Sequence, residues 1–164
     1  MSPLFKNIEA FVFDFDGVLT DNSVFIDEKG IESVKCSRAD GLAFDVLRKL
    51  NMPAYILSTE KNLVVHERAK KLKIEAINGV SNKVQSLKKL VDSKGYNLHN
   101  IVYIGNDLND YQVMQSCGFS ACPMDSHYKI KEISSVVLNT NGGCGVAREL
   151  LEDVFKLDFI QILF

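Results

Sequence analysis

The sequence predicts an α/β fold in which a mainly parallel β-sheet carries helices on both faces. Short apolar runs alternate with longer helical segments along the 164 residues. This alternation implies right-handed crossovers between parallel strands, as in Rossmann-like domains. The composition, with 46% hydrophobic and 24% charged residues, is that of a globular chain. Because no linker, internal repeat or low-complexity stretch divides the chain, we expect a single domain over residues 1–164.

The strands are predicted from short apolar runs that end in polar residues. The first run, 10–15, has the sequence AFVFDF, and a continuous apolar run of this kind is typical of a strand buried on both faces. Residues 24–34 predict a small β-hairpin insertion, because the turn sequence DEKG at 27–30 separates two short segments. Further strands are expected at 54–57, 75–77, 101–104, 119–122 and 136–138.

Helices are expected where apolar residues recur at a spacing of three or four. On this pattern they cover about 40–50, 62–72, 81–91, 108–115 and 145–154. The inward face of the first is predicted to consist of Leu42, Val46, Leu47 and Leu50. Asn62 and Ser81 are predicted to cap the second and third helices with their side-chain oxygens. The tail at 159–164 is notably apolar, with the sequence FIQILF.

Polar residues follow three of the predicted strands at the point where each ends. Parallel α/β sheets bind ligands beyond the carboxyl ends of their strands, so we expect these side chains to converge on one edge. They are Asp14 and Asp16, then Ser58, then Asn106, Asp107 and Asp110.

The pair Asp14 and Asp16 indicates a divalent cation. Two carboxylates one residue apart repel each other, and Mg²⁺ with its preference for oxygen ligands compensates that repulsion. Such a pair alone also fits a turn or a helix cap, and the acidic cluster at 105–110 has the same alternative. Two clusters that both follow buried strands favour the metal site.

Ser58 and Lys83 complete a predicted phosphoryl-transfer site. A serine hydroxyl and nearby backbone N–H groups at a strand end can hold a phosphate oxygen. A lysine at a helix start lies where the dipole favours anions, so a neighbouring anion is expected, although a solvated surface lysine is the alternative. In the predicted reaction one carboxylate attacks phosphorus to form an aspartyl-phosphate, which water hydrolyses, and a second carboxylate acts as general acid and base.

These residues resemble the four motifs of the haloacid dehalogenase-like phosphatases. The matching residues are DFDGVLTD at 14–21, Ser58, Lys83 and GNDLND at 105–110, and the likeness extends over nearly the whole chain, including 36–41, 56–61 and 141–149. The sequence is most similar to the branch without a separate cap domain, which includes 3-deoxy-octulosonate (KDO) 8-phosphate phosphatases and nonulosonate 9-phosphate phosphatases. It also resembles the phosphatase-like domain fused to acylneuraminate cytidylyltransferases.

The resemblance implies roles for the individual residues. Asp14 would be the nucleophile and a metal ligand, Asp16 the general acid and base with its carbonyl on Mg²⁺, and Lys83 a catalytic phosphate ligand. The other metal-site candidates are Asn106, Asp107 and Asp110. The phosphate- and substrate-binding candidates are Ser58, Thr59, Thr20, Glu60, Lys61, Arg68 and Arg38.

Two positions depart from the commonest family pattern. The family usually has Asp where this chain has Asn106, and an amide oxygen can bind Mg²⁺ but lacks the charge, which Asp107 could supply. Glu60 and Lys61 resemble members that act on 2-keto-3-deoxynononate (KDN) 9-phosphate, so this substrate is preferred to KDO 8-phosphate. The alternative is that Glu60 and Lys61 simply begin a solvated helix.

The resemblance further implies a homotetramer associating through hairpins like that at 24–34. The apolar tail could cover a neighbour's site or pack on its own domain. Because of Asn106, a weakly active or non-catalytic module associated with a cytidylyltransferase is the alternative function. A signalling receiver domain is a third possible class. It places its acidic residues in a different order along the chain, and this argues against it.

Charge and composition exclude other classes of partner. The net charge of −2 does not indicate a basic surface that would bind nucleic acid. No apolar run approaches the roughly 20 residues that span a membrane. The four cysteines form no C-x-x-C pair, so we expect reduced thiols and a cytoplasmic protein.

Overall fold

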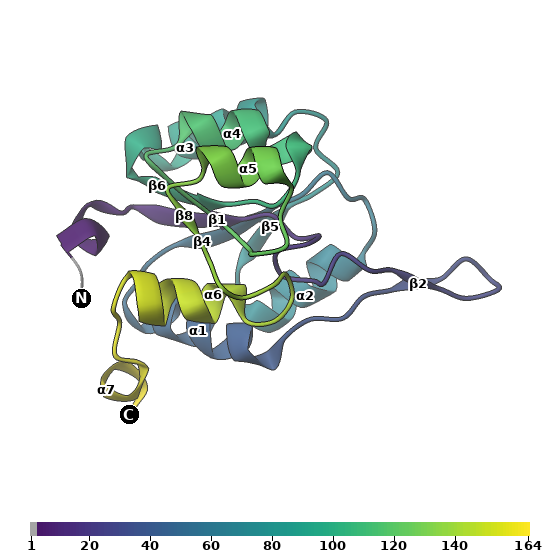
Figure 1. Cartoon of the computed structure of the whole chain (residues 1–164), viewed down its shortest axis with the longest axis horizontal. Coiled ribbons are helices and arrows are strands. Elements are labelled where there is room, and N and C mark those ends of the chain that lie inside the picture. The colour runs from purple at the N-terminus through teal and green to yellow at the C-terminus, as the bar shows by residue number, and fades with distance from the viewer. Residues whose placement is uncertain (1–2) are drawn as a thin grey trace.

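The computed structural model describes residues 3–164, which form a six-stranded sheet with helices on both faces (Figure 1). The strand order is β5-β4-β1-β6-β7-β8, and every neighbouring pair is parallel. The predicted α/β fold class is therefore confirmed. The strands are β1 (Ala10–Phe13), β4 (Ala54–Leu57), β5 (Glu75–Ile77), β6 (Ile101–Ile104), β7 (Phe119–Cys122) and β8 (Val136–Val137).

Two helical layers cover the sheet. One layer contains α1 (Arg38–Lys49), α2 (Val64–Leu72), α6 (Val146–Glu149), a π-helical turn at Leu150–Val154 and α7 (Phe159–Leu163). The opposite layer contains α3 (Lys83–Lys94), α4 (Tyr111–Ser116) and α5 (Tyr128–Ile133). Short 3-10 turns lie at Pro3–Asn7, Leu98–Asn100 and Leu108–Asp110.

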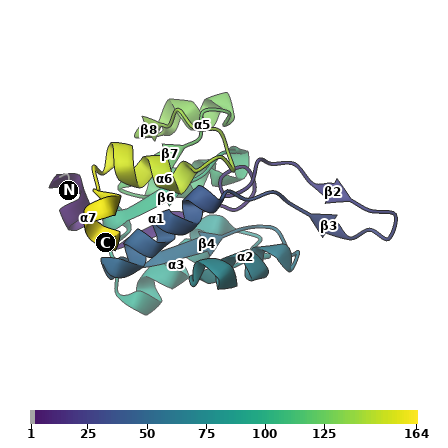
Figure 2. The same cartoon turned by 90° about the horizontal axis from the view of Figure 1, so that it is seen from below.

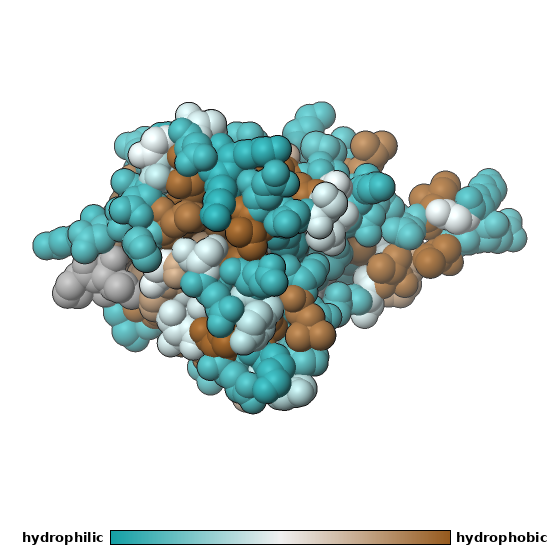
Figure 3. Space-filling model, turned by 90° about the horizontal axis from the view of Figure 1, so that it is seen from above, coloured by the Kyte–Doolittle hydropathy of each residue, from teal (hydrophilic) through white to brown (hydrophobic). Residues whose placement is uncertain are grey.

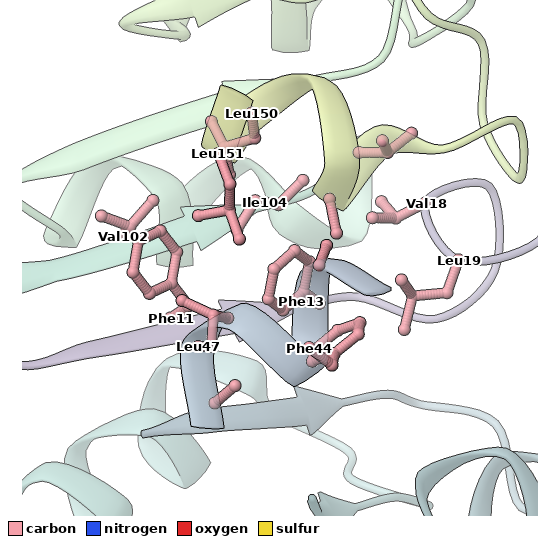
Figure 4. Close-up of a cluster of buried hydrophobic side chains, with 14 of the residues drawn as sticks. Phe11, Phe13, Val18, Leu19, Phe44, Leu47, Val102, Ile104, Leu150 and Leu151 are labelled. Atoms are coloured by element: carbon pink, nitrogen blue, oxygen red, sulfur yellow. The ribbon is translucent and has the colours of Figure 1, made fainter. Parts of the chain in front are cut away.

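Alternation along the strands divides the core into two apolar clusters. In β1, Phe11 and Phe13 face the α1 and α6 layer, whereas Val12 faces the α3 and α4 layer. Phe11 and Phe13 pack against Phe44 and Leu47 of α1, as Figure 4 shows. All four residues of β1 are completely buried, so the strand that leads to Asp14 lies at the centre of the molecule.

The first predicted helix differs from the prediction in its start and its buried face. It begins at Arg38, where the Ser37 hydroxyl accepts a hydrogen bond from the Ala39 N–H. Leu42 is 43% exposed, and the buried apolar face consists of Ala43, Phe44, Val46 and Leu47. The helix is therefore turned relative to the predicted stripe, because Phe44 occupies the position against the sheet.

The cap of α3 also differs from the prediction. Asn82, and not Ser81, accepts the hydrogen bond from the Gln85 N–H. At the start of α2 the N-cap position is Leu63, and Asn62, the predicted cap, lies one residue earlier and accepts from the Val64 N–H. Helix α5 was not predicted, because Ile130 is its one buried residue and such a segment carries no periodic apolar pattern.

The predicted hairpin consists of β2 (Phe25–Ile26) and β3 (Glu32–Ser33), which pair antiparallel. It projects away from the sheet and its helices (Figure 2). The Asp27 carboxylate holds its turn by accepting from the Lys29 and Ile31 N–H groups. Apolar side chains are gathered on this arm (Figure 3), with Phe25 63% and Ile26 66% exposed.

The C-terminal tail packs partly on its own domain. Phe159 is buried, and the Arg148 guanidinium lies 5.0 Å from the centre of its ring. Ile160 and Phe164 remain exposed. Within residues 3–164, no helix has the length and apolar character needed to cross a membrane.

Candidate active site

The carboxyl ends of β1, β4 and β6 bring the predicted site residues to one edge of the sheet. Strand β1 lies between β4 and β6, so Asp14 is flanked by the loops that begin at Ser58 and Gly105. A hollow of about 340 Å³ opens at this edge. Its lining includes Asp14, Asp16, Thr59, Asn106, Asp107 and Asn109.

A buried lysine connects the two acidic clusters. The Lys83 ammonium lies 2.8 Å from Asp14 Oδ1 and 2.7 Å from Asp110 Oδ1. All three side chains are at most 5% exposed. Lys83 is the first residue of α3, where the partial positive charge of the helix N-terminus disfavours a cation. The two carboxylates compensate for this unfavourable interaction. The surface-lysine alternative is therefore excluded.

Asp110 organises the loop after β6 and does not face the hollow. Its Oδ2 accepts hydrogen bonds from the N–H groups of Asn106 at 3.0 Å and Asp107 at 3.4 Å. Its Oδ1 accepts from Lys83 and from the Tyr103 hydroxyl at 2.9 Å. With both oxygens occupied, Asp110 is placed to support neighbouring groups and not to bind a metal directly.

Two glycines permit the close approach of these loops. Gly17 has a φ of +75°, and a Cβ on it would overlap the Asn106 amide. A Cβ on Gly105 would lie 2.6 Å from Cβ of Asp110. The Asn106 side chain is thereby held directly against the turn that follows Asp14 and Asp16.

The electrostatics of the site fit a bound cation. Burial raises the pKa of Asp14 well above its usual range, Asp110 raises it further, and Lys83 opposes the rise. Burial and the nearby Glu60 raise the pKa of Asp16, again opposed by Lys83. Burial alone would lower the pKa of Lys83, but Asp14 and Asp110 raise it.

The donor set suits a hard cation such as Mg²⁺. The hollow is lined by Asp14, Asp16, Asn106 and Asp107, whose carboxylate and amide oxygens are ligands that Mg²⁺ prefers. Among residues 3–164, no three His, Cys, Asp or Glu side chains form a metal cluster by themselves. Beside the Asp14 carboxylate and the Asp16 carbonyl, the Asn106 amide oxygen would be a further ligand, and Asp107 also lines the hollow.

The loop after β4 is ordered by its own polar groups. Ser58 is buried, and its hydroxyl oxygen accepts from the Glu60 N–H at 3.0 Å. Glu60 Oε1 accepts from the N–H groups of Lys61 and Asn62. Asn62 Nδ2 in turn donates to Glu32 on the hairpin at 2.9 Å. Thr59 lines the hollow, whereas Lys61 is exposed.

Thr20 does not face the hollow, contrary to the prediction that it binds substrate. Its side chain is completely buried, and its hydroxyl oxygen accepts hydrogen bonds from the Gly17 and Asn22 N–H groups. Thr20 therefore stabilises the turn after the acidic pair, and its hydroxyl is not available to a substrate.

Arg38 and Arg68 are likewise not brought to this hollow within one chain. They line a separate hollow of about 270 Å³ between α1 and α2. Arg68 also donates to the Ser37 carbonyl at 2.6 Å. Their predicted contact with a substrate bound at Asp14 remains a prediction, because neither arginine lines the hollow beside Asp14 in the single chain.

Two features of the site are not evident from the sequence pattern. Tyr103 has the pattern of an apolar strand residue, although its hydroxyl donates to Asp110. The glycines at 142–143 pack against the turn after Asp16, where a Cβ on Gly142 would overlap the Gly17 carbonyl. The resemblance at 141–149 pointed to this loop but not to its contact.

An acidic hollow with a buried lysine, at the carboxyl edge of a parallel sheet, defines a Rossmann-like enzyme domain. The chain belongs to the haloacid dehalogenase-like hydrolases, whose family pattern matches residues 45–150. A haloacid dehalogenase family hydrolase structure from Streptomyces avermitilis has a TM-score of 0.89 and 37% identity, covering 93% of this chain and 87% of that one.

Two relatives with named substrates are also similar. The KDO 8-phosphate phosphatase of Salmonella typhi is 28% identical over 148 residues, which is 90% of this chain and 79% of the relative. The Moraxella catarrhalis KDO 8-phosphate phosphatase was solved with magnesium, phosphate and KDO. It has a TM-score of 0.89 and 28% identity, covering 93% of this chain and 88% of that one.

Proposed function

We propose that this protein is a Mg²⁺-dependent phosphatase that hydrolyses the terminal phosphate of a 2-keto-3-deoxy sugar acid. The observation that carries the proposal is the Lys83 ammonium 2.8 Å from the Asp14 carboxylate at the wall of the hollow. The family membership and the phosphatases among the relatives support it.

In the proposed reaction, an Asp14 oxygen attacks phosphorus and the bond from phosphorus to the sugar oxygen breaks. Asp16 gives its proton to the departing sugar oxygen. Asp16 then takes a proton from water, whose oxygen attacks phosphorus and releases Asp14 and inorganic phosphate. The raised pKa of Asp16 supports its role as a proton donor. Mg²⁺, held by the Asp14 carboxylate, the Asp16 carbonyl and the Asn106 amide oxygen, would supply charge neutralisation.

Lys83 and the loop at 58–60 would bind the phosphoryl group. Asp14 and Asp110 accept two of the three Lys83 ammonium protons, which leaves one for a phosphate oxygen. The Ser58 oxygen already accepts from Glu60, so its own proton can be donated to phosphate.

We favour KDN 9-phosphate as substrate, with KDO 8-phosphate next. Glu60 would accept hydrogen bonds from sugar hydroxyls, and Lys61 would pair with the substrate carboxylate. The proximity of Glu60 to Asp16, which contributes to the raised pKa of Asp16, supports a place for Glu60 beside the reacting group. Rates measured side by side on the two substrates decide between them.

Asn106 motivates a second candidate function, that of a weakly active or non-catalytic domain associated with a cytidylyltransferase. Its neutral amide lies where a charged ligand is usual in the family, and so it would bind Mg²⁺ more weakly. We also infer a homotetramer, supported by the exposed apolar arm at 24–34, and a cytoplasmic location, supported by four free cysteines.

The test is phosphate release from both sugar-acid phosphates with Mg²⁺ present. We expect Asp14→Asn to abolish turnover, because the amide cannot attack phosphorus, while the thermal unfolding temperature stays near that of the parent. An Asp14→Asn variant as active as the parent would overturn the nucleophile assignment. A parent without activity on either substrate would favour the second candidate function.

A further inference from the structure

We propose that Tyr103 is a positioning residue of this site, and that its hydroxyl holds Asp110 so that Lys83 is shared with Asp14. The inference rests on the proposed phosphatase function and adds a residue that belongs to none of the four motifs. Tyr103 touches neither the hollow nor a reacting atom, so its effect is transmitted through Asp110 and Lys83.

The geometry is a chain of hydrogen bonds from the sheet to the hollow. Tyr103 lies within β6 and is completely buried, and its hydroxyl donates to Asp110 Oδ1 at 2.9 Å. The same oxygen accepts from Lys83 at 2.7 Å, and Lys83 lies 2.8 Å from Asp14. Burial, with the charges of Asp110 and Asp14, raises the pKa of Tyr103 well above its usual value, so the hydroxyl keeps the proton that it donates.

The Tyr103 hydroxyl matters because the Lys83 ammonium interacts with two carboxylates, those of Asp14 and Asp110. A hydrogen bond from Tyr103 to Oδ1 withdraws charge from the oxygen that holds Lys83. Without it, Asp110 would attract the ammonium more strongly and draw it away from Asp14 and from a bound phosphate. Tyr103 thus sets the balance of one cation between two anions.

The sheet offers a matched control in Tyr55. Both tyrosines pair with Val12, Tyr55 from β4 and Tyr103 from β6, and both belong to the same apolar cluster. The Tyr55 hydroxyl lies 3.1 Å from the Tyr96 hydroxyl and contacts no group of the site. Tyr103→Phe and Tyr55→Phe therefore each remove one hydroxyl from equivalent places in the sheet, and only the first affects Asp110.

The experiment compares the two variants with the parent on p-nitrophenyl phosphate, below all melting temperatures. For Tyr103→Phe we expect kcat/KM to fall at least about tenfold, the size expected for a lost hydrogen bond to a charged group. The inhibition constant for inorganic phosphate should rise by a similar factor. Tyr55→Phe should change both quantities much less, even if it lowers the melting temperature equally.

Equal kinetic losses in the two variants, or losses that follow the melting temperature alone, would overturn the positioning role. Tyr103→Met also lacks the hydroxyl and provides the same comparison if Tyr103→Phe does not fold. Failure of both to fold would assign Tyr103 a structural role instead. Calorimetric binding of inorganic phosphate to parent and variants requires no turnover, so it tests Tyr103 even if phosphatase activity is absent and the proposed function fails.

Discussion

At the scale of single residues, a comparison of Gly17 with Gly30 distinguishes the cost of backbone strain from the cost of crowding against the site. Their φ values are +75° and +74°, but a Cβ on Gly30 meets nothing within 4 Å, whereas one on Gly17 overlaps the Asn106 amide. We expect Gly30→Ala to cost no more than about 1–2 kcal/mol, the strain of a left-handed backbone. Gly17→Ala should cost more and reduce phosphatase activity, because Asn106 must move.

Urea unfolding and phosphate release on the two alanine variants measure this difference. If both variants lose equal stability and keep parental activity, Asn106 is not held by contact with Gly17.

Asn106 itself is tested by restoring a carboxylate. Asn106→Asp adds a negative charge to a hollow that already holds Asp14 and Asp16. We expect the Mg²⁺ concentration for half-maximal activity to fall by roughly tenfold, because an added unit charge in contact with a divalent ion is worth several kcal/mol before desolvation. Asn109→Asp, which adds the same charge elsewhere in this hollow, should have a smaller effect.

A titration of activity against Mg²⁺ gives this comparison directly. An unchanged half-activation concentration in Asn106→Asp would contradict a metal-binding role for position 106. A large gain in maximal turnover would support the idea that the natural site is weakened by its amide.

At the scale of elements, Asp40 connects α1 to α6. It is buried, and its Oδ1 accepts from the Ala147 N–H at 2.9 Å. Burial raises its pKa from 3.8 to about 6, so the folded state binds this proton more tightly than the unfolded state does. The stability associated with Asp40 is therefore fully present below pH 4 and is lost as the pH rises towards and through 6, by about 3 kcal/mol in total.

Urea unfolding between pH 4 and 7 checks this prediction. Asp40→Asn should remove that part of the pH dependence, whereas Asp45→Asn, at a partly exposed position on the same helix, should retain it. A parent whose stability rises steadily over this interval, and a slope unaffected by Asp40→Asn, would contradict the assignment.

The elements also show what sequence reasoning can reach. Strands β1, β4 and β6 were predictable because each is a continuous apolar run, and their polar ends placed Asp14, Ser58 and Asn106 at one edge. The residue that caps α3 was not predictable, because Ser81 and Asn82 are adjacent and both suit a cap. In the structure Asn82 is the cap, and Lys83, the first residue of the helix, is buried. The hydrogen-bond partners of the Tyr103 and Thr20 hydroxyls depend on how separate turns pack, which the hydrophobic periodicity of the sequence does not predict.

At the scale of the whole molecule, the projecting hairpin leaves apolar surface that the domain does not cover. Val24, Phe25, Ile26 and Ile31 are between 49% and 66% exposed and lie on one short arm. Contiguous apolar surface of this kind is typical of an interaction site. Association of such arms between copies would bury these side chains, which supports the inferred tetramer.

We therefore expect the parent to sediment as a tetramer, and Phe25→Ser combined with Ile26→Thr to shift it to a smaller species. Leu63→Ser is the matched control, because Leu63 is 73% exposed but lies outside the arm.

Phosphatase activity measured on the separated species then reports whether assembly matters to the site. The hairpin reaches the loop after β4 through Glu32 and Asn62, so loss of neighbouring arms should disturb that loop and raise KM more than it lowers kcat. A parent that sediments as a monomer at assay concentrations would contradict the assembly, while leaving the chemistry at Asp14 untouched.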